Sequence, residues 1–154
     1  MPSNHLPAVA MSTLGWAGIV AGGLVAAVTD PLDVYRGSWV AAYLVLVVGV
    51  AQVVMGWARR GSGAGGAGTG WAQCAGWNLG SAGVIAGTLT KASLLVYVSS
   101  AALVVALIIA ALGTRIAGKA SGGGLWLLAY RAMLVILAVS IPVGMALSYL
   151  RHTG

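Results

Sequence analysis

Few side chains in this sequence could carry catalytic or metal-binding chemistry. The chain has two carboxylates, Asp30 and Asp33, no glutamate, two histidines and a single cysteine, Cys74. It contains no HExxH, CxxC or GxxxxGK[ST] motif, so the zinc, dithiol and phosphate-loop chemistries that need those spacings are not indicated. A disulfide or a thiolate metal site needs more than one cysteine. We therefore expect no enzyme activity, no metal and no cofactor, and we interpret Cys74 as a packing residue.

The remaining ionisable residues are separated along the chain. His5 and His152 lie near opposite ends, so they do not suggest a haem held by two imidazoles at one depth. Asp30 and Asp33 could hold a divalent cation only with further oxygen ligands, and none are nearby. We expect instead that Asp30 lies at a helix end and that Asp33 pairs loosely with Arg36 in solvent.

The composition indicates an integral membrane protein. Of 154 residues, 60% are hydrophobic and 6% are charged, against about 25% charged in an ordinary soluble domain. The net charge of +6 could suggest nucleic-acid binding in a soluble protein. Here the basic residues lie at the ends of apolar runs, which is typical of loops that meet anionic lipid head groups. The sequence therefore predicts lipid, and not nucleic acid, as the acidic partner.

Three membrane spans stand out. A spanning helix needs about 20 mostly apolar residues, because each residue rises about 1.5 Å through about 30 Å of hydrocarbon. Residues 8–28, 38–57 and 125–150 meet this condition, and each run is bounded by charge or proline. The first run also resembles a signal peptide, but no Lys or Arg precedes it, so we expect it to remain as a span.

The apolar stretch 71–113 is too long for one span, because a single helix of that length would measure about 64 Å. Its one charge, Lys91, indicates a turn at residues 88–91. The sequence thus predicts an all-α bundle of five transmembrane helices, with spans at 71–89 and 92–113. The alternative has four passes, with 71–90 lying at the membrane interface, since this segment contains glycines, Gln73 and Asn78.

We expect a plasma-membrane protein, and the loop charges favour its N-terminus inside and its C-terminus outside. In the five-pass arrangement the inner side holds four basic residues and the outer side three, with Arg131 near the inner end of the last span. The inner set is Arg59, Arg60, Arg115 and Lys119, and the outer set is Arg36, Lys91 and Arg151. The six tryptophans lie mostly near predicted span ends, where we expect them to anchor the helices at the interface.

Two parts of the chain resemble each other at an offset of 65 residues. Residues 14–24 and 79–89 share seven of eleven positions, and two more exchange Ile with Val. Each copy precedes a long aliphatic run. We interpret the chain as a duplicated helical hairpin, with repeats at 8–58 and 71–113 related by an axis along the membrane normal, followed by an extra helix at 125–150.

The repeat places glycines on one face of each copy. At 100° per residue the glycines of the second copy fall within an arc of about 60°. Both copies contain the GxxxG spacing that lets helix backbones approach closely. We expect these faces to pack the first span against the third, with an oligomer interface or a narrow substrate path as alternatives. The residues are Gly15, Gly18, Gly22, Gly76, Gly80, Gly83 and Gly87.

Polar side chains within spans are costly unless they are paired or functional. Gln52, Asn78 and Arg131 are the candidates for a polar path or for contact with lipid head groups. Gln73 could join helices by hydrogen bonds or line the same path.

Two functions follow from these patterns. The first is a non-enzymatic structural subunit that packs through its glycine faces with itself, as a homo-oligomer, or with a larger membrane complex. The alternative is a small-solute transporter or channel, with a path between the duplicated hairpins.

Overall fold

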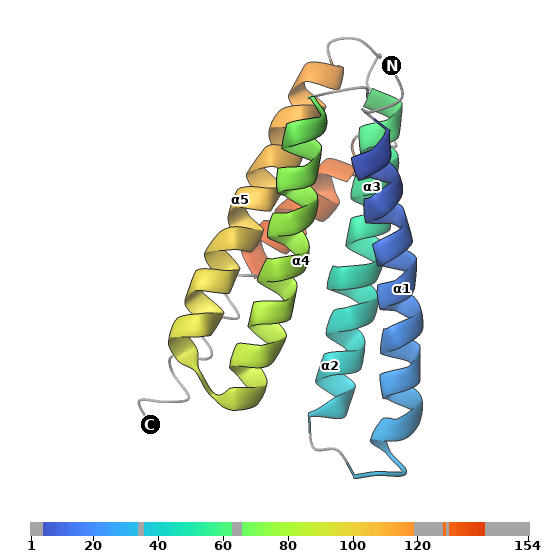
Figure 1. Cartoon of the computed structure of the whole chain (residues 1–154), viewed down its shortest axis with the longest axis vertical. Coiled ribbons are helices and arrows are strands. Elements are labelled where there is room, and N and C mark those ends of the chain that lie inside the picture. The colour runs from blue at the N-terminus through green and yellow to red at the C-terminus, as the bar shows by residue number, and fades with distance from the viewer. Residues whose placement is uncertain (1–4, 34–35, 63–65, 119–127, 129, 141–154) are drawn as a thin grey trace.

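The structure is a computed structural model that describes residues 5–33, 36–62, 66–118, 128 and 130–140. All regular structure in these residues is helical (Figure 1), as the sequence predicts. The helices are α1 (Leu6–Thr29), α2 (Gly37–Tyr43), the π-helical segment η2 (Leu44–Ala51), α3 (Gln52–Ser62), α4 (Ala67–Thr90) and α5 (Ser93–Gly118). A shorter apolar helix covers Tyr130–Ser140.

Three helical stretches are long and apolar enough to cross a membrane: Leu6–Thr29, Gly37–Gly61 and Ser93–Gly113. They correspond to the predicted spans at 8–28, 38–57 and 92–113, and their length and composition fit the predicted membrane protein. The second stretch is continuous through α2, η2 and α3. Helix α4 is as long as α1, at 24 residues. The predicted last span, 125–150, lies partly outside the described residues.

The helices form two antiparallel hairpins that lie side by side (Figure 1). In the first, α1 packs along α2, η2 and α3; in the second, α4 packs along α5. The second hairpin turns at Lys91, as predicted, with Lys91 in the left-handed region at φ 60°. The backbone N–H of Ala92 then bonds to the carbonyl of Gly87 at 2.9 Å and closes the helix end.

Each hairpin closes through its glycines. A Cβ at Gly22 would lie 2.9 Å from the carbonyl oxygen of Ala41 and 3.0 Å from the nitrogen of Val45. A Cβ at Gly87 would lie 3.2 Å from the carbonyl oxygen of Ala92 and 3.0 Å from the nitrogen of Val96. Only glycine permits this approach of two backbones, which gains dispersion and weak C–H···O contacts.

The partners of the glycine faces differ from our expectation. The first face does not pack on the second. Gly15 and Gly18 approach η2 and α3 around Gly49, while Gly80 and Gly83 approach α5 around Ser99. Gly76 is looser, because a Cβ there would meet α5 only at 3.7 Å. The glycines therefore close each hairpin internally.

The close glycine contacts of the two hairpins follow one pattern, with a shift of one residue part-way along. Gly22 contacts Ala41, and Gly87 contacts Ala92, so the residues that these two glycines meet are 51 positions apart in the sequence. Gly15 contacts the carbonyl of Gly49, and Gly80 contacts that of Ser99, so here the contacted residues are 50 positions apart. The π-helical segment η2 lies at this point, and its i→i+5 ring holds one more residue than an α-helical turn. Helix α5 is α-helical throughout.

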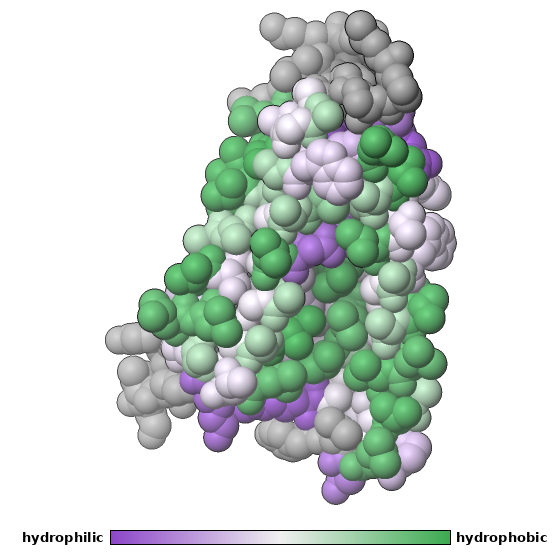
Figure 2. Space-filling model, in the orientation of Figure 1, coloured by the Kyte–Doolittle hydropathy of each residue, from purple (hydrophilic) through white to green (hydrophobic). Residues whose placement is uncertain are grey.

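On the face seen in Figure 2, hydrophobic side chains cover most of both hairpins. Large aliphatic side chains are exposed along α1 and α5, among them Val20, Leu24, Leu94, Val105 and Ile108. Neither helix has an amphipathic pattern that would set a watery face against a buried one. This is the surface expected of helices surrounded by hydrocarbon.

Gly22→Ala should destabilise the first hairpin, whereas Gly23→Ala should not. A Cβ at Gly22 meets Val45 Cγ2 at 2.6 Å as well as the backbone of α2, and a Cβ at Gly23 meets nothing within 4 Å. Overpacking of this kind costs about 1–3 kcal/mol. Thermal unfolding in mild detergent should show a lower midpoint for Gly22→Ala alone, and equal midpoints for the two variants would contradict the close packing.

Candidate functional site

A line of polar groups runs where the first hairpin meets α4, and we name it the polar seam. One side is formed by α2, η2 and α3, and the other by α4 alone. The first hairpin contributes the side chains of Arg36, Tyr43, Gln52 and Arg59 and the carbonyl of Val47. Helix α4 contributes the side chains of Gln73, Trp77 and Ser81 and the carbonyl of Thr88.

Helix α4 can serve both neighbours because it has two different faces. Gln73, Trp77 and Ser81 recur every four residues, so they form one stripe along the helix. The stripe lies about 90° around the helix from the glycines that face α5. One face thus closes the second hairpin by small-residue packing, and the other presents hydrogen-bonding groups to the first hairpin.

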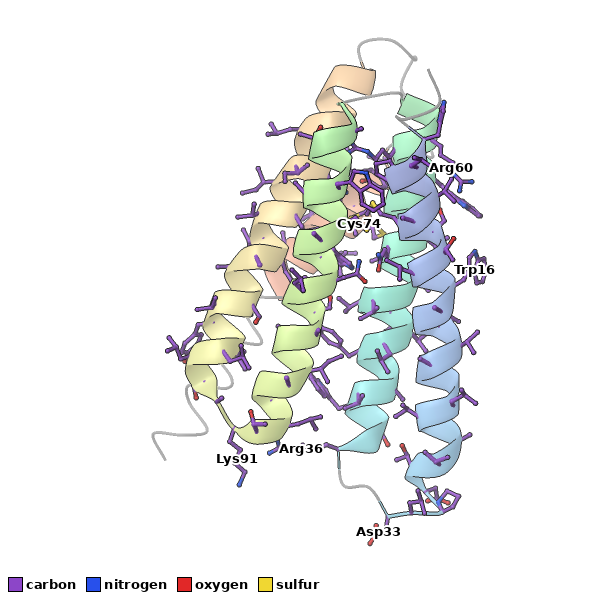
Figure 3. All side chains as sticks on the ribbon, in the orientation of Figure 1. Trp16, Asp33, Arg36, Arg60, Cys74 and Lys91 are labelled. Carbon is purple, nitrogen blue, oxygen red and sulfur yellow. The ribbon has the colours of Figure 1, made fainter. Side chains whose placement is uncertain are left out.

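An arginine lies at each end of the seam. Arg36 Nη1 donates a hydrogen bond to the carbonyl of Thr88, and Figure 3 shows this side chain at the start of α2 beside the end of α4. At the other end, Arg59 Nη1 donates to Gln73 Oε1 at 3.1 Å and Nη2 to the carbonyl of Gly66 at 3.0 Å. Both arginines are half-buried, so their charges lie at the mouths of the interface.

Between the arginines, Trp77 fills the middle of the seam. Its side chain is 0% exposed, and Nε1 donates to the Val47 carbonyl at 3.1 Å. Val47 belongs to η2, where an extra residue disturbs the regular helical hydrogen bonds. An indole N–H from α4 thus stabilises an irregular stretch of backbone inside a span, a place where every backbone group needs a partner within the protein.

Three buried polar groups on the seam lack a hydrogen-bond partner in the described part of the chain. They are both amide atoms of Gln52, the Ser81 hydroxyl and the Tyr43 hydroxyl. Gln52 is 0% exposed and Ser81 is 1% exposed. The Tyr43 and Ser81 hydroxyls face each other across the seam without closing a well-formed bond. An unsatisfied buried polar group costs about 1–3 kcal/mol, so each needs an explanation.

The residues predicted for a polar path do not all come together. Gln52 lies on the seam. Asn78 instead donates to the carbonyl of Cys74 on its own helix, at 2.8 Å. Arg131 is exposed, whereas its neighbour Tyr130 is buried in the core with Leu134. The last helix therefore contributes packing to the centre of the molecule, and its arginine points away.

Sequence reasoning missed Tyr43, Trp77 and Ser81. Trp77 was expected to be an interface anchor like the other tryptophans, but it is fully buried. The four-residue spacing of Gln73, Trp77 and Ser81 was the available signal for a shared helix face.

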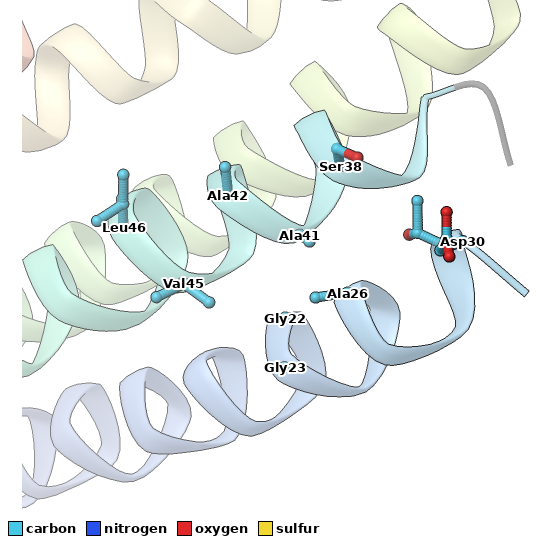
Figure 4. A pocket seen from close by; sticks show the side chains of 10 residues that line it. Gly22, Gly23, Ala26, Asp30, Ser38, Ala41, Ala42, Val45 and Leu46 are labelled. Carbon is cyan, nitrogen blue, oxygen red and sulfur yellow. The ribbon is translucent and has the colours of Figure 1, made fainter.

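The carboxylates lie away from the seam. Asp30 and Asp33 are exposed near the end of α1, and the expected pairing of Asp33 with Arg36 is replaced by the bond from Arg36 to Thr88. No group of three or more His, Cys, Asp or Glu side chains comes together in the described residues. Asp30 lies at the mouth of a groove between α1 and α2 (Figure 4), which is lined by Gly22, Gly23, Ala26, Thr29, Asp30, Ser38, Ala41, Ala42, Val45 and Leu46.

Comparisons with protein-family models, with curated proteins and with solved structures gave no match for this chain. The groups of the polar seam are therefore the basis for assigning a function.

Gln52→Met and Gln73→Met should affect stability in opposite ways. Gln52 leaves no protein group unpaired when it is replaced, so Gln52→Met should keep or raise the unfolding midpoint. Gln73→Met removes the acceptor of Arg59 and the donor to Met55 Sδ, so it should cost about 1–3 kcal/mol. Thermal unfolding of both variants in the same detergent is the measurement, and a large loss for Gln52→Met would mean that Gln52 has a protein partner.

Proposed function

We propose that the chain crosses the plasma membrane five times, as two duplicated hairpins and a C-terminal helix. Two observations support this proposal. Helix α4 packs along α5, which is apolar and long enough to span the membrane. If α5 spans the membrane, its antiparallel partner α4 lies at the same depth and spans it too. The glycine contacts of the two hairpins are also equivalent apart from the one-residue drift at η2.

Arg60 and Lys91 should then lie on opposite sides of the membrane, with Arg60 inside. The test uses Arg60→Cys and Lys91→Cys, each in a Cys74→Ser background, labelled in intact cells with a maleimide that does not cross the membrane. Only Lys91→Cys should react before lysis. If α4 lay flat at the interface, both positions would be on the same side and would label alike.

For the function, we propose a small-solute transporter or channel whose path is the polar seam. The observation that carries this proposal is the burial of Gln52 and Ser81 without a well-formed hydrogen bond to any of the described residues. Polar residues that only hold helices together make hydrogen bonds across the interface, as Gln73 and Trp77 do. Groups that stay unpaired in a membrane interior are satisfied by water or by a solute that visits them.

The order of groups along the seam suits a gated path. From one end to the other the first hairpin presents Arg36, Tyr43, the Val47 carbonyl, Gln52 and Arg59. Trp77 donates its hydrogen bond to the Val47 carbonyl, which lies between the unpaired groups of Tyr43 and Gln52. Its buried indole separates two polar stretches, which makes it the residue whose movement would join them.

The other candidate, a non-enzymatic subunit, rests on the apolar outer faces of α1 and α5. The glycine faces expected to bind a partner are already covered within each hairpin. A partner would have to cover lipid-facing aliphatic side chains instead.

Trp77→Ala should open the path, and Trp71→Ala is its control. Trp71 lies on the same helix but is 49% exposed. In proteoliposomes, Trp77→Ala should raise the flux of at least one small solute, tested with glycerol, urea and chloride, by tenfold or more over wild type and Trp71→Ala. Trp77→Phe loses the N–H but keeps an aromatic ring at this position, so its flux should stay close to that of wild type.

If wild type and both Trp77 variants are folded yet transport none of these solutes, the transport proposal fails. Co-purification of wild type with a fixed stoichiometry of itself or of another membrane protein would then favour the subunit function. Ser81→Cys in a Cys74→Ser background adds a separate measurement, because a small water-soluble thiol reagent should reach this position faster when Trp77 is replaced by Ala.

A further inference from the structure

We propose that the polar seam selects small monovalent anions over cations. This inference rests on the proposed transport function and adds the class of solute. It combines the arginine at each mouth of the seam with the neutral hydrogen-bond donors buried between them.

The mouths of the seam set its charge preference. Arg36 and Arg59 each hold a guanidinium half-buried at the interface, fixed by Thr88 and by Gln73 on α4. In the described residues no carboxylate lies on the seam. Asp30 and Asp33 are exposed near the end of α1, and Figure 3 shows Asp33 at the tip of the first hairpin, beyond Arg36. A positive charge with low-dielectric surroundings raises the local concentration of anions and repels cations.

The interior offers donors and no fixed charge. The Gln52 amide, the Ser81 hydroxyl and the Tyr43 hydroxyl can each turn an N–H or O–H toward an anion. None of them makes a well-formed hydrogen bond within the part of the chain that the structure describes. The same groups could also offer oxygen atoms to a cation, so the arginines decide between the two signs. Because these side chains lie in a packed core beside Trp77, the solute must be small and largely stripped of water.

The geometry also explains why the arginines are held by α4. An arginine side chain exposed to solvent at a span end would interact with anionic lipid head groups and would not place its charge over the seam. Arg36 and Arg59 instead bond across the seam, so that each charge stays over the line of unpaired groups. Arg60 is next to Arg59 but exposed, and it provides a matched comparison with the same charge on the same helix.

The test is the reversal potential of Trp77→Ala in a planar bilayer with a tenfold gradient of potassium chloride. An anion path places the reversal potential near the chloride equilibrium value. Adding Arg36→Gln or Arg59→Gln should lower the chloride-to-potassium permeability ratio at least tenfold, while Arg60→Gln should leave it unchanged. Arg36→Lys should keep the preference, which separates the effect of charge from that of folding.

The outcomes distinguish this inference from the function on which it depends. Flux of glycerol or urea without chloride current would overturn the anion preference and leave a neutral-solute path. A potassium-selective current would overturn it as well. Absence of flux for every solute in folded protein would overturn both proposals.

Discussion

In a lipid bilayer every backbone polar group must be satisfied within the protein, and this constraint organises the whole structure. There is no hydrophobic gain when one apolar helix meets another in hydrocarbon, so close packing and hydrogen bonds must hold the helices together. The chain uses both, at separate interfaces. Glycines bring backbones together within each hairpin, as at Gly22 and Gly87. Hydrogen bonds across the polar seam join one hairpin to the other, as from Trp77 to Val47.

Much of the fold could be predicted from the sequence, because the bilayer reduces the possibilities. The lengths of the apolar runs and the position of Lys91 predicted three helices and the second turn to within a few residues. The glycine repeat predicted which residues lie at close helix contacts. It could not predict their partners, since Gly15 faces Gly49 and not the third helix, and small-residue spacing alone does not say which neighbouring helix fills the groove.

The site was harder to predict, because composition shows that a residue is polar but not where its partner lies. Gln52 was recognised as a polar residue in a span, and it does lie on the seam. Asn78 looked equivalent, yet it bonds to the carbonyl of Cys74 four residues earlier, a local solution open to any amide on a helix. Trp77 looked like an interface anchor because tryptophan prefers that depth, whereas an irregular helix opposite it provides a carbonyl acceptor.

The extra residue in η2 gives the two halves of the molecule different roles. One added residue turns everything after it by about 100° around the helix axis, relative to an uninterrupted helix. Beyond η2, Val53 still faces Gly15 on α1, while Met55 and Arg59 lie opposite Gln73 on α4. Helix α5 has no such insertion. The added residue thus lets one helix pack closely on α1 and form hydrogen bonds with α4 over the same stretch.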